Sequence, residues 1–258
     1  MTMARPAAIA DWLVPNWPAP PGVRALCTTR AGGASAAPRD SLNLGDHVGD
    51  APEAVRANRE LLRGVVPGPV FLRQVHGTQV VELAPGTPDG TQADGCTAHR
   101  PGVACTIMVA DCLPVLFARG DGTAVGAAHA GWRGLAGGVL EAVAGALGAG
   151  GECIAWLGPC IGPSAFEVGP EVRDAFTRHD AAAAACFAPH AAHAGKWLAD
   201  LPALARRRLR AAGVAAVHGN DGGPAWCTVA NPLRFFSYRR DVPALGGAGR
   251  FAACVWRE

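Results

Sequence analysis

The stretch VACTIMVADCLPVLFARGDGTAVGAAHAGWRG (residues 103–134) decides the fold class of this chain. It contains three short apolar runs of strand type, Val103 to Ala110, Leu113 to Ala118 and Ala124 to His129. The segment Arg119-Gly-Asp-Gly122 between the last two runs has the composition of a hairpin turn. We therefore expect these two runs to be antiparallel neighbours in a sheet.

Outside this stretch, further strand-like runs alternate irregularly with helical patterns. The additional strands are expected at Val23 to Thr29, Val70 to Val75, Cys153 to Leu157 and Phe251 to Trp256. Helical spacing predicts helices over Pro52 to Val65 with Asp50 as the cap, Leu135 to Leu147, and Trp197 to Ala212. The alternation predicts a mixed α/β protein, and the sequence has neither an internal repeat nor a linker.

Composition limits the classes of function. The 258 residues suffice for one large α/β domain or two small ones, and half of them are hydrophobic, which allows a sizeable core. With 23 basic and 21 acidic residues the net charge is only +2, so we expect neither nucleic acid nor a membrane as a partner. The one basic cluster, Arg206 to Arg210, lies within a helical pattern and is predicted to be a solvated helix face.

The N-terminal segment and the cysteines predict a cytoplasmic protein. Residues 1–20 have no apolar core of signal-peptide type, and no stretch is long and apolar enough to span a bilayer. The nine cysteines include no C-x-x-C pair and show no regular spacing, which argues against a disulfide framework. Most of these thiols are expected to be reduced, and several lie in apolar runs where cysteine acts as a small buried hydrophobic residue.

Three polar residues stand where predicted strands end: His76, Cys112 and His129. Two imidazoles and a thiolate are good ligands for a divalent ion such as zinc, and three protein ligands leave a fourth position open for water or substrate. The separations of 36 and 17 residues match no local zinc motif. The residues alone therefore leave three interpretations open: a metal site, a Cys–His nucleophilic pair, or unrelated structural roles.

Two glycine-bearing segments supply candidate substrate contacts. Gly131-Trp-Arg-Gly134 follows a strand and precedes a helical pattern, so Arg133 could hold phosphate at a helix N-terminus or be a surface arginine of the turn. The long polar loop after the first strand contains Arg30, Asn43 and His47. Arg30 and Asn43 are its expected substrate contacts, although Asn43 could equally be a turn residue and His47 a helix-entry residue.

Five motifs resemble those of the YfiH family, also called the laccase-domain, polyphenol oxidase or peptidoglycan editing factor family. They are Arg73-Gln-Val-His-Gly77, Ala93-Asp-Gly95, Ala110-Asp-Cys112, His129-Ala-Gly-Trp-Arg-Gly134 and Gly158-Pro-Cys-Ile-Gly-Pro163. The likeness runs nearly end to end. It implies one domain over residues 1–258, an α/β fold with stacked mixed β-sheets flanked by helices, resembling the fold of bacterial toxin cysteine hydrolases.

The resemblance also implies a function and a ligand set. Members of the family are zinc-dependent purine nucleoside phosphorylases with adenosine deaminase and methylthioadenosine phosphorylase activity, so purine nucleosides and phosphate are the implied partners. Their zinc ligands fall on His76, Cys112 and His129 in this chain. His47 is a candidate for protonating the leaving purine. The nucleobase-deaminase signature H-x-E followed by P-C-x-x-C is absent from the sequence, so deamination would use another scaffold.

Three alternatives remain beside this function. A copper polyphenol oxidase could use the same two histidines and cysteine, but no H-x-H pair suggests a multi-copper cluster. A metal-free hydrolase could use Cys112 as nucleophile and His129 as base. A peptidoglycan precursor editing factor would act on cell-wall precursors or on the ligase that makes them.

Overall fold

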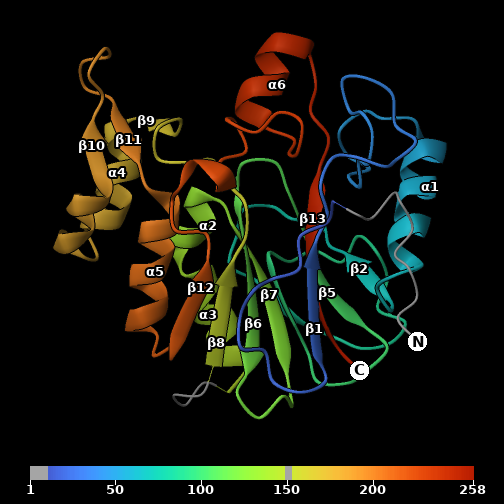
Figure 1. Ribbon diagram of the computed structural model, residues 1–258. Helices are drawn as coiled ribbons and strands as arrows, with labels where there is room; N and C mark the ends of the chain where they lie inside the picture. Colours follow the sequence, from blue (N-terminus) through green and yellow to red (C-terminus); the bar gives the residue numbers. More distant parts are fainter. Residues whose placement is uncertain (1–10, 149–152) are drawn as a thin grey trace.

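Two stacked β-sheets form the centre of the computed structural model, which describes residues 11–148 and 153–258 (Figure 1). The larger sheet has six strands in the order β12-β8-β6-β7-β4-β3. Their bounds are Ala216–Gly219, Cys153–Leu157, Leu113–Arg119, Val125–Ala130, Gly95–Ala98 and Val80–Leu83. The second sheet has four strands in the order β1-β13-β5-β2. Their bounds are Val23–Cys27, Phe251–Arg257, Ala104–Val109 and Pro69–Phe71.

Alternating side chains of β6 explain why the sheets stack. Leu113, Val115 and Phe117 belong to the core on the outer face of the six-stranded sheet. Leu116 and Ala118 point the other way, into the core shared with the four-stranded sheet. Because successive side chains of a strand point to opposite faces, an apolar run without polar interruptions requires cover on both sides.

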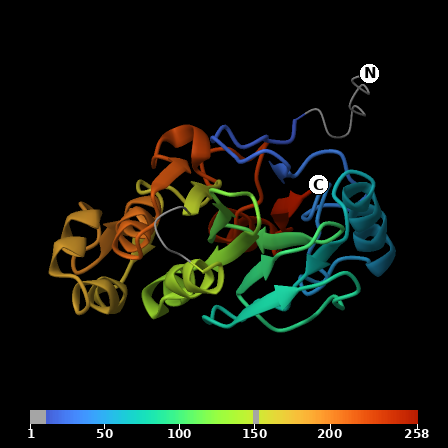
Figure 2. The same ribbon diagram turned by 90° about the horizontal axis from the view of Figure 1, so that it is seen from below.

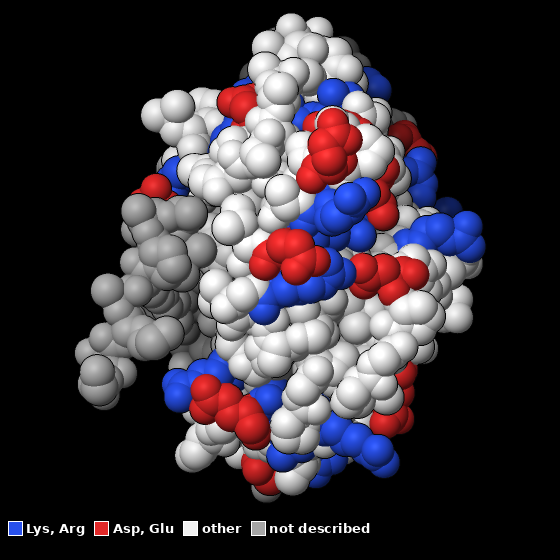
Figure 3. Space-filling model, turned by 90° about the vertical axis from the view of Figure 1, so that its right-hand side faces the viewer, with Lys and Arg blue, Asp and Glu red and all other residues white. Residues whose placement is uncertain are grey.

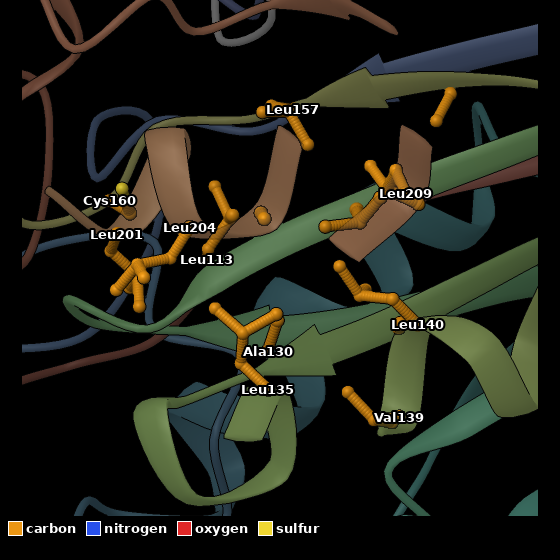
Figure 4. Packing of buried hydrophobic residues seen from close by; sticks show 14 of the residues in the cluster. Leu113, Ala130, Leu135, Val139, Leu140, Leu157, Cys160, Leu201, Leu204 and Leu209 are labelled. Carbon is orange, nitrogen blue, oxygen red and sulfur yellow. The ribbon is translucent and has the colours of Figure 1, made fainter. Parts of the chain in front are cut away.

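Helices cover the outer faces of both sheets. The helices α2 (Trp132–Gly137), α3 (Val139–Ala146) and α5 (Leu201–Ala211) pack on the six-stranded sheet, where Leu140 and Leu204 belong to the same core cluster as Leu113 (Figure 4). On the far side, Leu62 of α1 (Pro52–Arg63) packs with Phe71 in the core of the four-stranded sheet. The result is a layered arrangement of helix, sheet, sheet and helix.

A smaller unit extends the molecule beyond the two sheets. It holds α4 (Pro170–Thr177) and a three-stranded sheet of β9 (Glu167–Val168), β10 (Phe187–Pro189) and β11 (Trp197–Ala199) in the order β10-β11-β9. Figure 2 shows this unit at the side of the sheets opposite to α1. The helix α6 (Tyr238–Leu245) lies over one end of both sheets (Figure 1).

The structure confirms the mixed α/β class with stacked mixed sheets flanked by helices, and all seven predicted strands overlap observed ones. β6 and β7 pair antiparallel across the predicted turn, in which the Gly122 N–H donates to the Arg119 carbonyl oxygen at 2.9 Å. The predicted strand from Val70 to Val75 is shorter, because pairing ends at Phe71. The likeness to toxin hydrolases stays a prediction.

Three helix predictions need correction. The helix predicted over Leu135 to Leu147 is broken into α2 and α3 by Gly138, whose φ of 103° ends the first helix. The helix predicted from Trp197 begins only at Leu201, because residues 197–199 pair with β9 and β10 and the side chain of Asp200 caps α5. Asp50 is not the cap of α1; Ala51 is, without a side-chain hydrogen bond.

The basic cluster on α5 is a solvated face only in part, because Arg210 is exposed but Arg206, Arg207 and Arg208 are half-buried. Arg206 donates to the carbonyl oxygens of Val217, Gly219 and Asn220 in and after β12. Arg207 pairs with Asp180 and Arg208 with Glu141, each at 2.5 Å. These guanidinium groups tie α5 to its neighbours, which the helical pattern in the sequence did not reveal.

Acidic and basic side chains are interspersed on the face of the molecule shown in Figure 3. This mixture agrees with the net charge of +2. Among the described residues, no helix is both long enough and apolar enough to cross a bilayer.

Candidate metal centre and cavity

His76, Cys112 and His129 meet at the end of the two sheets that α6 covers. His76 follows β2, Cys112 immediately precedes β6, and His129 is the penultimate residue of β7. One ligand atom from each lies within 4.8 Å of the others, and the Cys112 Sγ is 3.7 Å from the His76 Nε2. Zinc bonds of about 2.3 Å to sulfur and 2.0 Å to nitrogen place such atoms about 3.5 Å apart in a tetrahedral site. The donor set fits a metal ion.

Asp94 orients this trio. Its Oδ1 accepts a hydrogen bond from the His129 Nδ1 at 2.8 Å, which leaves the Nε2 of that ring as the ligand atom. Its two oxygens also accept the backbone N–H groups of Val75, His76 and Gly77, and so fix the loop in which His76 has a φ of 61°. A buried carboxylate behind a histidine ligand is a recurrent feature of metal sites.

Gly131 makes room for the trio. A Cβ atom at this position would lie 2.8 Å from the Cδ2 of His76 and 2.9 Å from the Sγ of Cys112. Both separations are too short for ordinary contact, so any larger residue would push the two ligands away. The lack of space around Gly131 therefore explains why the Gly-Trp-Arg-Gly motif begins with glycine.

The trio is electrostatically coupled. Burial opposes charge on Cys112, but His129 and hydrogen bonds from both histidines lower the pKa of its thiol to about 6. Burial likewise opposes charge on His129, but Cys112 and the hydrogen bond to Asp94 raise its pKa to about 9. In the protein without metal, Cys112 and His129 therefore form a thiolate–imidazolium pair near neutral pH. A thiolate is the form of cysteine that binds metals and attacks carbonyl carbon.

A cavity of about 550 Å³ opens next to the trio. This volume lies in the range of small-molecule sites. Its walls are partly apolar, with Met108, Ile161, Phe166 and Leu201, and the aromatic ring of Tyr238 stands at the exposed rim. Such walls can enclose a flat heterocyclic ring.

Three arginines line the same cavity: Arg133, Arg239 and Arg250. The guanidinium of Arg133 lies 4.4 Å from the ring centre of Trp132, and that of Arg239 donates to the Glu167 carbonyl oxygen. The Arg250 guanidinium donates to the carbonyl oxygens of Ala248 and Gly249. The sequence suggested only Arg133; the other two follow from contacts across the fold.

The structure does not bring Arg30 or Asn43 into this cavity. Arg30 donates to the carbonyl oxygens of Asp40 and Pro232 and pairs with the Asp40 carboxylate, so its guanidinium holds the loop together. Asn43 is fully buried, and its Oδ1 accepts the backbone N–H of Arg250 at 2.8 Å. His47 does line the cavity. Burial and the charge of Arg250 lower the pKa of His47, although its contact with Asp46 opposes this.

A second group of ligand-type residues, Glu167, His190 and His193, is arranged as a hydrogen-bonded cluster. The Nδ1 of His190 accepts the backbone N–H groups of Ala192 and His193, so in the neutral ring the proton lies on Nε2, which faces Glu167 at 3.4 Å. A metal ligand needs a lone pair on the atom that faces the metal. The first trio, with Asp94 behind His129, is the better metal centre.

The sequence matches the profile of the family described as multi-copper polyphenol oxidoreductase laccase over residues 24–258. It is 55% identical to a purine nucleoside phosphorylase of Pseudomonas aeruginosa, over 96% of this chain and 98% of the relative. It is 49% identical to the purine nucleoside phosphorylase YfiH of Escherichia coli, over 95% of this chain and 98% of that protein. This chain belongs to the YfiH, or laccase-domain, family.

Solved structures of YfiH-type proteins share the fold. A Neisseria meningitidis protein of family DUF152 superposes with a TM-score of 0.88 at 48% identity, covering 96% of this chain and 99% of the other. YlmD from Geobacillus stearothermophilus superposes with a TM-score of 0.82 at 30% identity, covering 96% of both chains. The resemblance predicted from the motifs is thereby confirmed. A His–Cys–His group in a YfiH-family protein can bind a metal, and copper and zinc both accept these ligands.

Proposed function

We propose that this protein is a zinc-dependent purine nucleoside phosphorylase that also deaminates adenosine and cleaves methylthioadenosine by phosphorolysis. One observation carries the proposal: a single cavity joins the His76, Cys112 and His129 trio to three arginines and an apolar wall. The names of the relatives from Pseudomonas aeruginosa and Escherichia coli support phosphorolysis of purine nucleosides.

The arginines would bind phosphate. Arg133 is exposed and makes no hydrogen bond or ion pair with any of the described residues, so all its donors are free. Arg239 uses two of its side-chain nitrogens on the Glu167 carbonyl oxygen and stays at the cavity wall. Guanidinium groups recognise phosphate with paired hydrogen bonds. The helix α2 has only six residues, so the side chains rather than the helix end carry this step.

The apolar side of the cavity would hold the nucleoside. Phe166 and Tyr238 offer aromatic faces to the purine, and Met108 and Ile161 exclude water from it. Zinc held by His76, Cys112 and His129 would act as a Lewis acid toward the bound nucleoside. Asp94 keeps the His129 ring in the tautomer that binding requires.

Phosphorolysis forms one bond and breaks one. An oxygen of phosphate bonds to C1′ of the ribose as the bond from C1′ to N9 of the purine breaks. The electron pair goes to the purine, which takes up a proton and leaves as the free base beside ribose 1-phosphate. Holding both reactants in line in one cavity is the main contribution of the protein. His47 is our candidate for the group that donates this proton to the leaving base.

Product analysis tests the proposal. Adenosine incubated with phosphate should give adenine and ribose 1-phosphate, which require phosphate, and inosine, which does not. The variant His76→Ala should lose all products, whereas His99→Ala, at an exposed histidine outside the cavity, should keep them. Metal analysis should find about one zinc per chain; copper in its place would favour the oxidase. Turnover that survives in His76→Ala would show that the site is wrongly assigned.

The thiolate–imidazolium pair of Cys112 and His129 favours one second candidate, a metal-free cysteine hydrolase. The two candidates differ in what removal of metal does. A zinc enzyme loses activity with a chelator and regains it with zinc, whereas a cysteine hydrolase is unaffected by the chelator and is inhibited by zinc.

A further inference from the structure

Asp111 stands between the metal centre and the helix that carries two cavity residues. It directly precedes Cys112 and has a φ of 85°, in the left-handed region that non-glycine residues seldom adopt. Its carboxylate is held by two partners outside the trio. One carboxylate oxygen accepts the hydroxyl of Thr228, and the other accepts the backbone N–H of Arg239 at 2.6 Å.

The bond to Arg239 caps α6 from a distant part of the chain. Arg239 is the second residue of this helix, and its N–H is one of the first-turn donors without a partner inside the helix. Asp111 supplies that partner across 128 residues of sequence. A carboxylate at this position is also favoured by the helix dipole.

The backbone of Asp111 holds a second part of the cavity wall. Its carbonyl oxygen accepts the N–H of Ile161 at 2.9 Å. Asp111 thus connects Cys112 on one side with Ile161 and α6, which bears Tyr238 and Arg239, on the other. The path from Cys112 to these wall residues consists of the backbone of Asp111, its short side chain and two hydrogen bonds.

We propose that Asp111 is a positioning residue that couples the zinc site to the phosphate site. Zinc bound at the trio fixes the position of Cys112, and Asp111 in turn fixes the position of Arg239. Zinc and phosphate therefore bind cooperatively. The inference rests on the proposed zinc and phosphate binding. Coupling of this kind is reciprocal, so phosphate tightens zinc binding by the same factor.

Calorimetric titration of inorganic phosphate into metal-free and zinc-loaded protein measures the coupling without turnover. In the wild-type protein, zinc should tighten phosphate binding by about fivefold or more, within the usual range of such coupling. Asp111→Gly removes the carboxylate and leaves a residue that readily adopts the left-handed backbone. In this variant the ratio of phosphate affinities with and without zinc should fall most of the way to one. The absolute affinities also change, because a negative charge is lost, but their ratio isolates the coupling.

Ser237→Ala is the matched control. The Ser237 hydroxyl oxygen accepts the Arg240 N–H at 3.1 Å, so this variant also loses a cap of α6, yet no hydrogen bond among the described residues joins Ser237 to Asp111 or Cys112. Its coupling factor should equal that of the wild type. Where Asp111→Gly does not fold, Thr228→Val removes the other anchor of the same carboxylate and should lower the factor in the same direction.

Three results would overturn the inference: a coupling factor of one in the wild type, an unchanged factor in the Asp111 and Thr228 variants, or an equal loss in Ser237→Ala. The failure of the proposed function looks different. In that case the wild-type protein does not bind zinc, or does not bind phosphate, at all.

Discussion

At the residue scale, Gly131 decides how closely the ligands approach. A methyl group on this residue would press on His76 and Cys112 at less than 3 Å. Gly131→Ala should therefore weaken zinc binding by roughly tenfold or more, as displaced ligands or their supports do elsewhere. Competition against a chromophoric chelator measures the affinity. Gly145→Ala, with open space around its Cβ, is the control and should bind zinc like the wild type. If both variants bind zinc with the same affinity, the close approach at Gly131 does not control the position of the ligands.

Cys112 should be the reactive thiol of the metal-free protein. Its pKa of about 6 means that the thiolate predominates at pH 7, so iodoacetamide should modify it there and the rate should fall as the pH drops through 6. Zinc should protect it. Cys153, whose pKa burial raises to about 11, is an internal control that should stay unmodified. Mass spectrometry of peptides identifies the site. A rate at Cys112 that rises only above pH 8 would contradict the coupling with His129.

Residue types at strand ends suggested the trio, because histidine and cysteine are unusual after apolar runs. The partners that hold it could not be predicted in the same way. Asp94 reaches His129 across 35 residues and Asp111 reaches Arg239 across 128, and no local spacing encodes either contact. The motif Ala93-Asp-Gly95 marked Asp94 as a family feature but gave it no role. Arg30 had the right charge, but its guanidinium is used within its own loop.

At the scale of elements, the join of β11 and α5 depends on Asp200. Its side chain accepts the Ala203 N–H at 2.9 Å and so starts the helix where the strand ends. Asp200→Ala should lower the free energy of unfolding by about 1 kcal/mol, the usual cost of a lost cap. Urea denaturation measures the change. The exposed Asp174→Ala in α4 should stay within about 0.5 kcal/mol of the wild type. If Asp200→Ala also lowers the free energy of unfolding by no more than about 0.5 kcal/mol, the cap does not contribute to stability.

Strands buried on both faces were easier to predict than helix ends for a physical reason, whereas the short strands β3, β4, β9, β10, β11 and β12 were not predicted. A strand buried on both faces, such as β6, is a continuous apolar run that is visible in sequence. The start of α5 is not visible, because Trp197 and Leu198 fit the helical apolar pattern but are paired with β9 and β10 instead. Gly137 and Gly138 could have signalled the break between α2 and α3, since paired glycines weaken a helix.

At the scale of the whole molecule, the candidate metal centre lies at the end of the two sheets and draws its residues from both. His76 follows a strand of the four-stranded sheet, His129 lies in the six-stranded sheet, and Cys112 stands on the connection from one to the other. An ion bound by all three would link both sheets as well as the loop that Asp94 holds. The free energy of metal binding would then stabilise the entire fold rather than one loop.

Zinc should therefore stabilise the protein as a unit. At free zinc a hundredfold above its dissociation constant, binding to the folded state alone adds about 2.7 kcal/mol. For a chain of this size that corresponds to a rise in Tm of roughly 5–10 °C. Scanning calorimetry with and without a chelator measures it. His76→Ala should show no shift, and His99→Ala the full shift.

The shape of the transition carries further information, because the expected single domain predicts one cooperative unfolding step that zinc moves as a whole. Two transitions, of which zinc moves only one, would mean that the sheets unfold separately and that the link through Cys112 is too weak to join them. An equal shift in His76→Ala would place the stabilising ion elsewhere on the molecule.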